Sequence, residues 1–161
     1  MATIQLPPDF KELLRLLDSH RVEYLLIGGY AVAYHGYPRA TADMDLWVAV
    51  NPGNAQKLVE TLSAFGFGVP ELTRELFLQE NRVIRMGVPP VRVELLTSIS
   101  GVDFAQCFAE RVVDEIDGER VNVISLRHLR TNKAASGRHK DLDDLENLPT
   151  GEQSEGEGVR R

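Results

Sequence analysis

The stretch that decides the fold is LLIGGYAVAYHGYPRATADMDLWV, residues 25–48. Its apolar start runs into Gly28 and Gly29, a pattern that predicts a buried strand meeting a tight turn. Residues 30–36 then predict a short helix closed by a glycine. The β-favouring residues that follow predict a second strand over residues 43–50. A strand, a glycine turn, a helix and a second strand are therefore expected in immediate succession.

Two aspartates, Asp43 and Asp45, stand at the start of the second predicted strand. Because strand residues two apart point to the same face, we expect their carboxylates to converge on one point. Two oxygen ligands at that spacing suit Mg²⁺ or Mn²⁺, and Mg²⁺ also takes substrate phosphate oxygens. Gly28 and Gly29 would let backbone amides approach a phosphate, and the helix behind them adds its positive end.

A third carboxylate, Glu94, lies between two apolar residues of a later predicted strand. It would meet the two aspartates if the strands are neighbours, and three carboxylates around divalent cations are suited to nucleotidyl transfer. Taken alone, each of these three features has a simpler structural interpretation. The glycine pair is then a simple turn, the aspartates lie on a solvated strand edge, and Glu94 is an exposed strand residue.

Outside the quoted stretch, helices and strands are mixed without a regular strand–helix–strand repeat. This order predicts an α+β (mixed α/β) fold and not a doubly wound parallel sheet. Caps and periodicity predict helices over 9–20, 51–64, 125–135 and 138–148, and hairpins over 82–96 and 112–124. We expect Asp9 to cap the first helix, and either Asn51 or Asn54 to cap the next.

Composition and length limit the classes of protein to which this chain can belong. The chain has 161 residues, of which 43% are hydrophobic, enough for the core of one domain. We expect that domain over residues 1–148, followed by a disordered acidic tail over 149–161. No apolar run approaches the roughly 20 residues that cross a bilayer, and the N-terminus has no signal-peptide pattern. A single cysteine excludes an internal disulfide and fits a cytoplasmic location.

The charge pattern is uneven. A net charge of -6 argues against a protein that coats nucleic acid. Basic residues nevertheless gather between residues 120 and 140, and this is where we expect an anionic partner to bind.

The quoted stretch resembles the signature of the polymerase-β-type nucleotidyltransferase superfamily, in which a glycine turn and a short helix precede a strand of the form hDhDh. Its form GG-x-A-x-x-x-H-G-x-x-R-x-T-x-D-x-D is similar to the AbiEii-like branch, known from toxin–antitoxin and phage-defence systems. RVELLTSISG (92–101) and LRHLRTNKAASGRHKDLDDL (126–145) extend the resemblance to the strand of the third carboxylate and to a Lys-rich helix. It covers most of residues 23–148.

This resemblance implies the nucleotidyltransferase fold, a small mixed β-sheet flanked by helices. It implies that Asp43, Asp45 and Glu94 are catalytic and hold the metal, Mg²⁺ or Mn²⁺, with Glu94 in place of the family's usual aspartate. The residues implied to bind the nucleotide are Gly28, Gly29, Arg39, Thr41, Lys133, Arg138 and Lys140, with Asp141 orienting one of the last cations.

The expected activity is therefore a metal-dependent transfer of a nucleoside monophosphate from an NTP to a hydroxyl of a tRNA, a protein or a small molecule. The resemblance favours a macromolecular acceptor and adds a toxin–antitoxin or phage-defence role with an antitoxin partner. The first alternative is a non-catalytic nucleotide-binding or regulatory subunit on the same fold. The second is an α+β domain in which the Asp-x-Asp pair has no chemical role.

Overall fold

The computed structural model describes residues 4–88 and 91–150. The predicted tail over 149–161 thus lies, from residue 151 on, outside the described residues, as do residues 89–90 of the first predicted hairpin turn. No helix in the described part combines the length and the apolar character needed to cross a bilayer.

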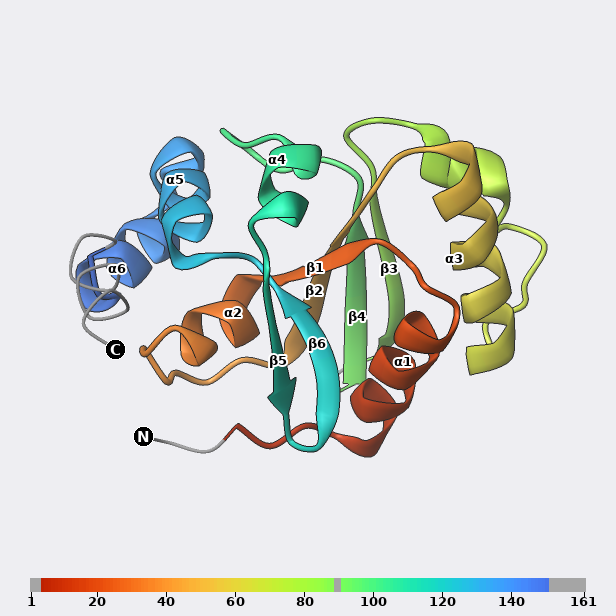
Figure 1. Cartoon of the computed structure of the whole chain (residues 1–161), viewed down its shortest axis with the longest axis horizontal. Helices are drawn as coiled ribbons and strands as arrows, with labels where there is room; N and C mark the ends of the chain where they lie inside the picture. The colour runs from red at the N-terminus through yellow and green to blue at the C-terminus, as the bar shows by residue number, and fades with distance from the viewer. Residues whose placement is uncertain (1–3, 89–90, 151–161) are drawn as a thin grey trace.

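A mixed sheet forms the centre of the described chain (Figure 1). Its strands are β1 (Tyr24–Ile27), β2 (Asp43–Val48), β3 (Val83–Val88), β4 (Val91–Leu96), β5 (Val112–Ile116) and β6 (Glu119–Val123). Their spatial order is β3-β4-β2-β1-β6-β5. β2 runs antiparallel to β1 but parallel to β4, and β1 runs parallel to β6. The sheet is therefore neither purely parallel nor a simple meander, and the predicted α+β class is confirmed.

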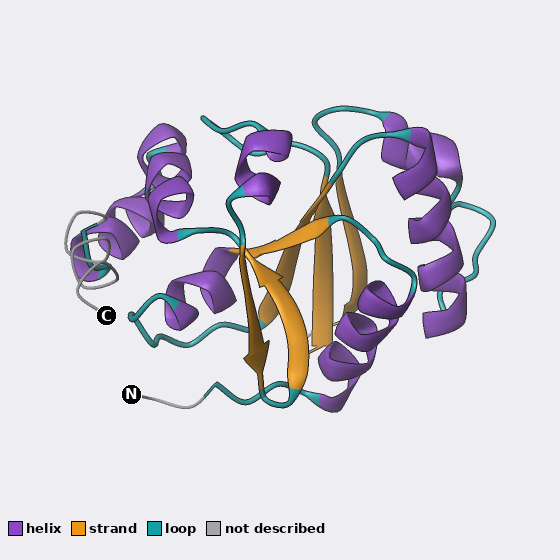
Figure 2. Cartoon of the chain, viewed as in Figure 1, coloured by secondary structure: helices purple, strands orange, loops and turns teal. Residues whose placement is uncertain are grey.

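Helices cover both faces of this sheet (Figure 2). They are α1 (Pro8–Ser19), α2 (Gly28–Tyr34), α3 (Pro52–Phe65), α4 (Phe104–Ala109), α5 (Leu126–Ser136), α6 (His139–Asn147) and the 3-10 helix η1 (Arg74–Leu78). Figure 1 shows α1 and α3 on one side of the sheet and α2, α5 and α6 on the other. Buried apolar residues come from helices on both sides of the sheet, including Leu13 of α1, Leu58 of α3, Val32 of α2 and Leu129 of α5.

The first helix shows how the sequence sets this packing. Phe10, Leu13, Leu14 and Leu17 recur at helical spacing and are all buried. The cap prediction for this helix was wrong, because no side chain within the described ranges caps it and Asp9 lies inside the first turn. Pro8 occupies the first helical position, where a residue without an N–H leaves no donor to satisfy.

At α3 the two candidate capping residues, Asn51 and Asn54, have different roles. Asn51 caps α3, and its side chain accepts a hydrogen bond from the backbone N of Asn54 at 2.8 Å. Asn54 is itself buried, and its amide donates to the carbonyls of Glu23 and Ala49. This amide therefore joins the start of α3 to the segments flanking β1 and β2.

Three elements depart from the predicted order, and one of them, the 3-10 helix η1, had no predicted counterpart. The expected turn at Gly28 and Gly29 does not precede α2, because the helix begins at Gly28 directly after β1. Gly28 has a φ of 69°, a left-handed value that lets the chain pass from strand to helix without a loop. The short helix α4 was not predicted. Its only signal was Asp103, whose side chain caps it by accepting from the backbone N of Gln106.

Candidate active site

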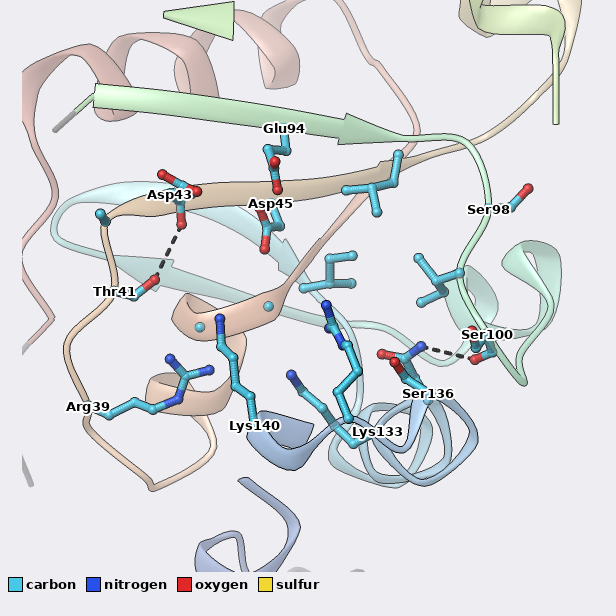
Figure 3. A pocket seen from close by; sticks show the side chains of 18 of the residues that line it. Arg39, Thr41, Asp43, Asp45, Glu94, Ser98, Ser100, Lys133, Ser136 and Lys140 are labelled. Carbon is cyan, nitrogen blue, oxygen red and sulfur yellow. Dashed lines mark hydrogen bonds between the residues drawn. The ribbon is translucent and has the colours of Figure 1, made fainter. Parts of the chain in front are cut away.

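The three predicted carboxylates meet because β2 and β4 are neighbours. In their parallel register Asp45 lies opposite Glu94, and Asp43 lies opposite Arg92. Residues in register on paired strands point to the same face, so Asp43, Asp45 and Glu94 share one face of the sheet. The predicted proximity of Glu94 to the aspartates is thereby confirmed (Figure 3).

This face forms one wall of a pocket of about 540 Å³. All the residues predicted to be catalytic or to bind the nucleotide line it, namely Gly28, Gly29, Arg39, Thr41, Asp43, Asp45, Glu94, Lys133, Arg138 and Lys140. Four further polar residues of the wall were missed: Ser98, Ser100, Asn132 and Ser136. The two serines before residue 101 belong to the loop after β4. Asn132 and Ser136 lie one turn apart on α5, a spacing that in hindsight marked them as sharing a face.

Asp45 is the most perturbed acid of the site. Its burial raises the pKa to about 7, and the negative charges of Glu94 and Asp43 add to this effect. Its Oδ1 atom is buried and has no hydrogen-bond partner among the described residues. A carboxylate in this position is costly to ionise in the protein alone, and a cation placed beside it would remove that cost.

The other two carboxylates are paired with arginines. Arg92 donates from Nη2 to Oδ2 of Asp43 at 2.9 Å, and Arg85 donates from Nε to Oε2 of Glu94 at 2.5 Å. As the side chains stand, no three histidine, cysteine, aspartate or glutamate residues within 4–88 and 91–150 are gathered closely enough to hold a metal. The donors are hard oxygens that suit Mg²⁺ or Mn²⁺, but at least one arginine pair must open to present all three.

The two glycines of the site make room for its side chains. A Cβ atom on Gly28 would overlap Oδ2 of Asp45, and a Cβ on Gly29 would overlap Oγ1 of Thr41. Thr41 in turn reaches the backbone carbonyl of Asp43 at 3.4 Å. Any larger residue at either glycine would push a predicted site residue out of place, so these positions need glycine whether or not a phosphate binds there.

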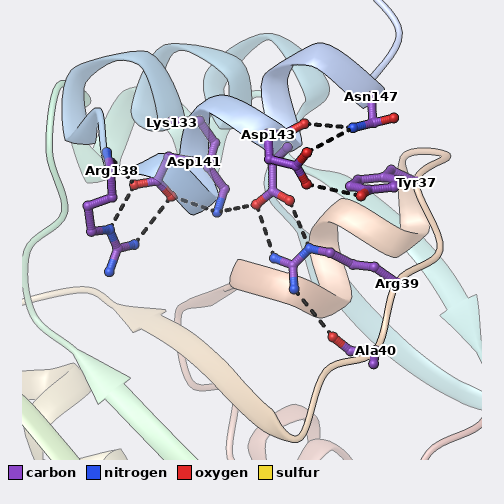
Figure 4. A network of polar contacts seen from close by, with 9 residues as sticks. Tyr37, Arg39, Ala40, Lys133, Arg138, Asp141, Asp143 and Asn147 are labelled. Carbon is purple, nitrogen blue, oxygen red and sulfur yellow. Dashed lines mark hydrogen bonds and ion pairs between the residues drawn. The ribbon is translucent and has the colours of Figure 1, made fainter.

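The cations across the pocket are tied into a buried network (Figure 4). Arg39 binds both oxygens of Asp144, at 2.8 and 3.0 Å. Lys133, only 4% exposed, lies 3.1 Å from Asp141 and 3.0 Å from Asp144. Arg138 also binds Asp141. Asp141 thus orients both Lys133 and Arg138, and much of the positive charge expected for a phosphate is already compensated within the protein.

Lys140 differs from these cations. It is exposed, and within the described residues its ammonium makes no hydrogen bond or ion pair. Figure 3 shows its side chain pointing from α6 toward the carboxylate wall. Its charge also acts to lower the pKa of Asp45, against the larger effect of burial. Lys140 is therefore the lysine best placed to meet an incoming phosphate.

The predicted basic stretch between residues 120 and 140 does not form one surface. Arg120 pairs with Asp18 at 2.6 Å, and Arg127 pairs with Glu110. Both partners lie outside the stretch, so charge counted along the sequence overstates the charge offered to a ligand. Only its C-terminal part reaches the pocket.

Comparisons with known proteins address the fold. No family model and no curated protein matches the sequence. Among solved structures, a Thermotoga maritima protein provisionally assigned as a nucleotidyltransferase aligns over 88% of this chain and 93% of its own, with a TM-score of 0.55 and 16% identity. The protein has a nucleotidyltransferase fold.

A second neighbour of this fold is an antigenic nucleotidyltransferase-like protein from Paracoccidioides brasiliensis. It aligns over 86% of this chain and 72% of its own, with a TM-score of 0.52 and 19% identity. At these identities the likeness establishes the fold alone. The AbiEii-like branch stays a prediction.

Proposed function

We propose that the protein is a metal-dependent nucleotidyltransferase that moves a nucleoside monophosphate from an NTP to a hydroxyl group. The observation that carries the proposal is the wall formed by Asp43, Asp45 and Glu94, which shares a 540 Å³ pocket with Lys140. A fold found in nucleotidyltransferase-like proteins supports the assignment, since it presents acids and cations to one cavity.

In the proposed reaction the acceptor oxygen attacks the α-phosphorus, and the bond from that phosphorus to the bridging oxygen of pyrophosphate breaks. The products are the nucleotidylated acceptor, pyrophosphate and one proton, which passes from the hydroxyl to the Asp45–Glu94 pair and then to water. When bound, Mg²⁺ or Mn²⁺ supplies positive charge that neutralises the phosphates and lowers the pKa of the attacking hydroxyl. The partnerless oxygen and raised pKa of Asp45 support a cation there.

The cations of the pocket have two different roles in the proposed reaction. Lys140 is free to contact the triphosphate, and Arg138 is largely exposed beside it. Lys133 and Arg39 are held by Asp141 and Asp144, so we assign them a positioning role toward α6. Thr41 and the two glycines complete the nucleotide side of the pocket.

The test is transfer of label from α-phosphate-labelled NTPs in Mg²⁺ or Mn²⁺, with tRNA, protein and small hydroxyl compounds as separate acceptors. We expect transfer by the native chain and a loss of at least about 100-fold in Asp45→Asn, since a ligand and proton acceptor are removed together. The matched control is Asp9→Asn, an exposed aspartate on α1. Lys140→Ala should weaken NTP binding without changing the thermal unfolding temperature.

A second function is favoured by the arginine pairs. Arg92 and Arg85 occupy Asp43 and Glu94, as expected of a subunit that binds a nucleotide without using a metal. Calorimetric NTP binding that is unaffected by a chelator, with no label transfer to any acceptor, would select this reading over the enzyme.

The toxin–antitoxin role is part of the proposal as a biological setting. We expect expression of the native chain to arrest bacterial growth, and Asp45→Asn to relieve the arrest at equal protein level. Arrest that persists in this variant would separate toxicity from nucleotidyl transfer.

A further inference from the structure

A second cavity adjoins the candidate active site. It has a volume of about 270 Å³ and meets the first pocket at Ser98 and Ile99, which line both. Its other lining residues are Trp47, Val48, Val50, Glu80, Thr97, Val102, Asp103 and Phe104. None of them was singled out from the sequence as a site residue.

The strand register places this cavity beside the carboxylate wall. Asp43, Asp45 and Trp47 alternate along β2, so they share one face of the sheet. Two residues along a strand span roughly 6.6 Å, which puts Trp47 one pleat beyond Asp45. Trp47 pairs with Leu96 of β4, and Leu96 lines the first pocket. The second cavity is therefore next to the carboxylate wall, and the two cavities share Ser98 and Ile99 in their linings.

The lining of the second cavity is chemically distinct from that of the first. It contains the carboxylates of Glu80 and Asp103 and the hydroxyls of Thr97 and Ser98. Among the described residues that line it there is no lysine, arginine or histidine, whereas four cations line the first pocket. A phosphate would be repelled here, while an ammonium group would be attracted.

An aromatic surface forms the remaining wall. Trp47 packs edge-to-face on Phe104 with ring centroids 5.0 Å apart, and Phe104 stacks on Phe108 of α4. The indole nitrogen of Trp47 is buried, and no hydrogen-bond partner for it lies in the part of the chain that the structure describes. Because Trp47 is buried, the partly buried ring of Phe104 is the aromatic surface nearest to a ligand in the cavity, and an aromatic ring beside carboxylates favours a ligand with positive charge.

We propose that this cavity is the acceptor site, and that it takes a small, positively charged, hydroxyl-bearing molecule and excludes a phosphate-bearing one. This inference rests on the proposed function and narrows its acceptor, since the phosphate backbone of a tRNA would meet the acidic rim of Glu80 and Asp103. The acceptor hydroxyl enters the first pocket past Ser98 and Ile99, and the reaction is the transfer already balanced above. The charges thus direct the two substrates to different sites. The NTP is attracted toward Lys140, and the acceptor is attracted toward the acidic cavity.

Trp47 is the chain's single tryptophan, so its fluorescence reports on this cavity without any chemistry. The probes are glucosamine, glucose and glucose 6-phosphate, three hexoses that differ mainly in charge, titrated at a pH where the amine is protonated. We expect glucosamine to bind about fivefold more tightly than glucose, from one favourable charge pair near the surface, and glucose 6-phosphate to bind most weakly.

The double variant Glu80→Gln, Asp103→Asn tests the role of the two negative charges in this cavity. Glutamine can still accept the hydrogen bond that Ser98 donates to Glu80, and asparagine can still cap α4, so the fold is preserved while two charges are lost. The preference for glucosamine over glucose should disappear in this variant. Asp9→Asn with Glu12→Gln makes the same change in charge on α1 and should leave the preference intact.

Two results would overturn the inference: glucose 6-phosphate binding as tightly as glucosamine, or a preference that survives the Glu80 and Asp103 changes. Transfer is measured separately with labelled NTP. A charge preference without any transfer supports the cavity as a binding site and counts against the catalytic function. Transfer to tRNA alone supports the catalytic function and counts against this acceptor class.

Discussion

Asp45 on β2 lies opposite Glu94 on β4, and the negative charge of Glu94 helps to raise the pKa of Asp45. The two residues are 49 positions apart in the sequence, yet the parallel register brings their carboxyl groups to one point. Without a metal, repulsion between these two carboxylates destabilises the folded protein.

The folded protein should lose stability as pH rises from about 4 to about 7. Burial raises the pKa of Asp45 to about 7 from a usual value near 4, so the folded state holds a proton in this window that the unfolded state has released. Asp45→Asn removes the titration and should flatten the dependence by an amount on the order of 1–3 kcal/mol. Urea unfolding without metal across this range measures it. Equal slopes for the two proteins would contradict the prediction.

Removing the arginine that holds Asp43 should strengthen metal binding. Arg92 donates to Asp43 at 2.9 Å, and its guanidinium must be displaced before that carboxylate can turn to a cation. We expect Arg92→Gln to bind Mn²⁺ about 3–10-fold more tightly, since a like charge leaves the site. Calorimetric titration without nucleotide is the measurement. Arg82→Gln, an exposed arginine just before β3, is the control, and weaker binding by Arg92→Gln would refute the idea.

Substitution of Gly28 should damage the site as well as the fold. Gly28→Ala combines a left-handed φ of 69° with overlap between the new Cβ and Asp45. We expect a loss of about 1–3 kcal/mol in unfolding free energy and weaker Mn²⁺ binding. Gly66→Ala provides the comparison, because its φ is also positive but nothing lies within 4 Å of the added Cβ. If both variants bind Mn²⁺ like the native protein, Gly28 serves only the backbone.

The buried ion network should contribute strongly to stability through Asp144. Burial opposes the ionisation of this carboxyl, but hydrogen bonds from Arg39 and Lys133 lower its pKa below the usual value. Its contribution is thus present above pH about 4 and is lost as pH falls further. Asp144→Asn leaves Lys133 partly uncompensated in the interior and should cost about 3–5 kcal/mol.

The adjacent residue supplies the control for that measurement. Asp143 is exposed, and among the described residues outside its own helix only the Tyr37 hydroxyl donates a hydrogen bond to it, at 3.0 Å. Asp143→Asn should change the unfolding free energy by less than about 1 kcal/mol. Equal losses in the two variants would show that the network does not depend on burial.

Much of the fold was readable because its signals are local. Helix α5 begins after Ser125, whose side chain accepts from the backbone N of His128, as its cap pattern predicts. The same local rule failed at Asp9, where Pro7 and Pro8 set the helix start instead. The six-residue helix α4 escaped prediction, because so short a segment offers less than two turns of periodicity.

The features of the candidate site likewise fall into those that local signals predicted and those that they did not. Asp43 and Asp45 could be placed on one face from the two-residue period of a strand, and Glu94 could be placed on the exposed side of its own strand. The second cavity, with Trp47 and Asp103, gave no local signal. It arises where the end of β2, the loop after β4 and the start of α4 come together.

By itself, then, the sequence determined the strand–glycine–helix–strand unit and the charged residues that line the described pocket. Only the tertiary structure decided which charges are free. Arg39 meets Asp144 across 105 positions, and Lys133 is buried between Asp141 and Asp144, whereas Lys140 remains open to the pocket. The physical reason is that a charge is compensated by its neighbours in space, and those neighbours come from segments that only folding brings together.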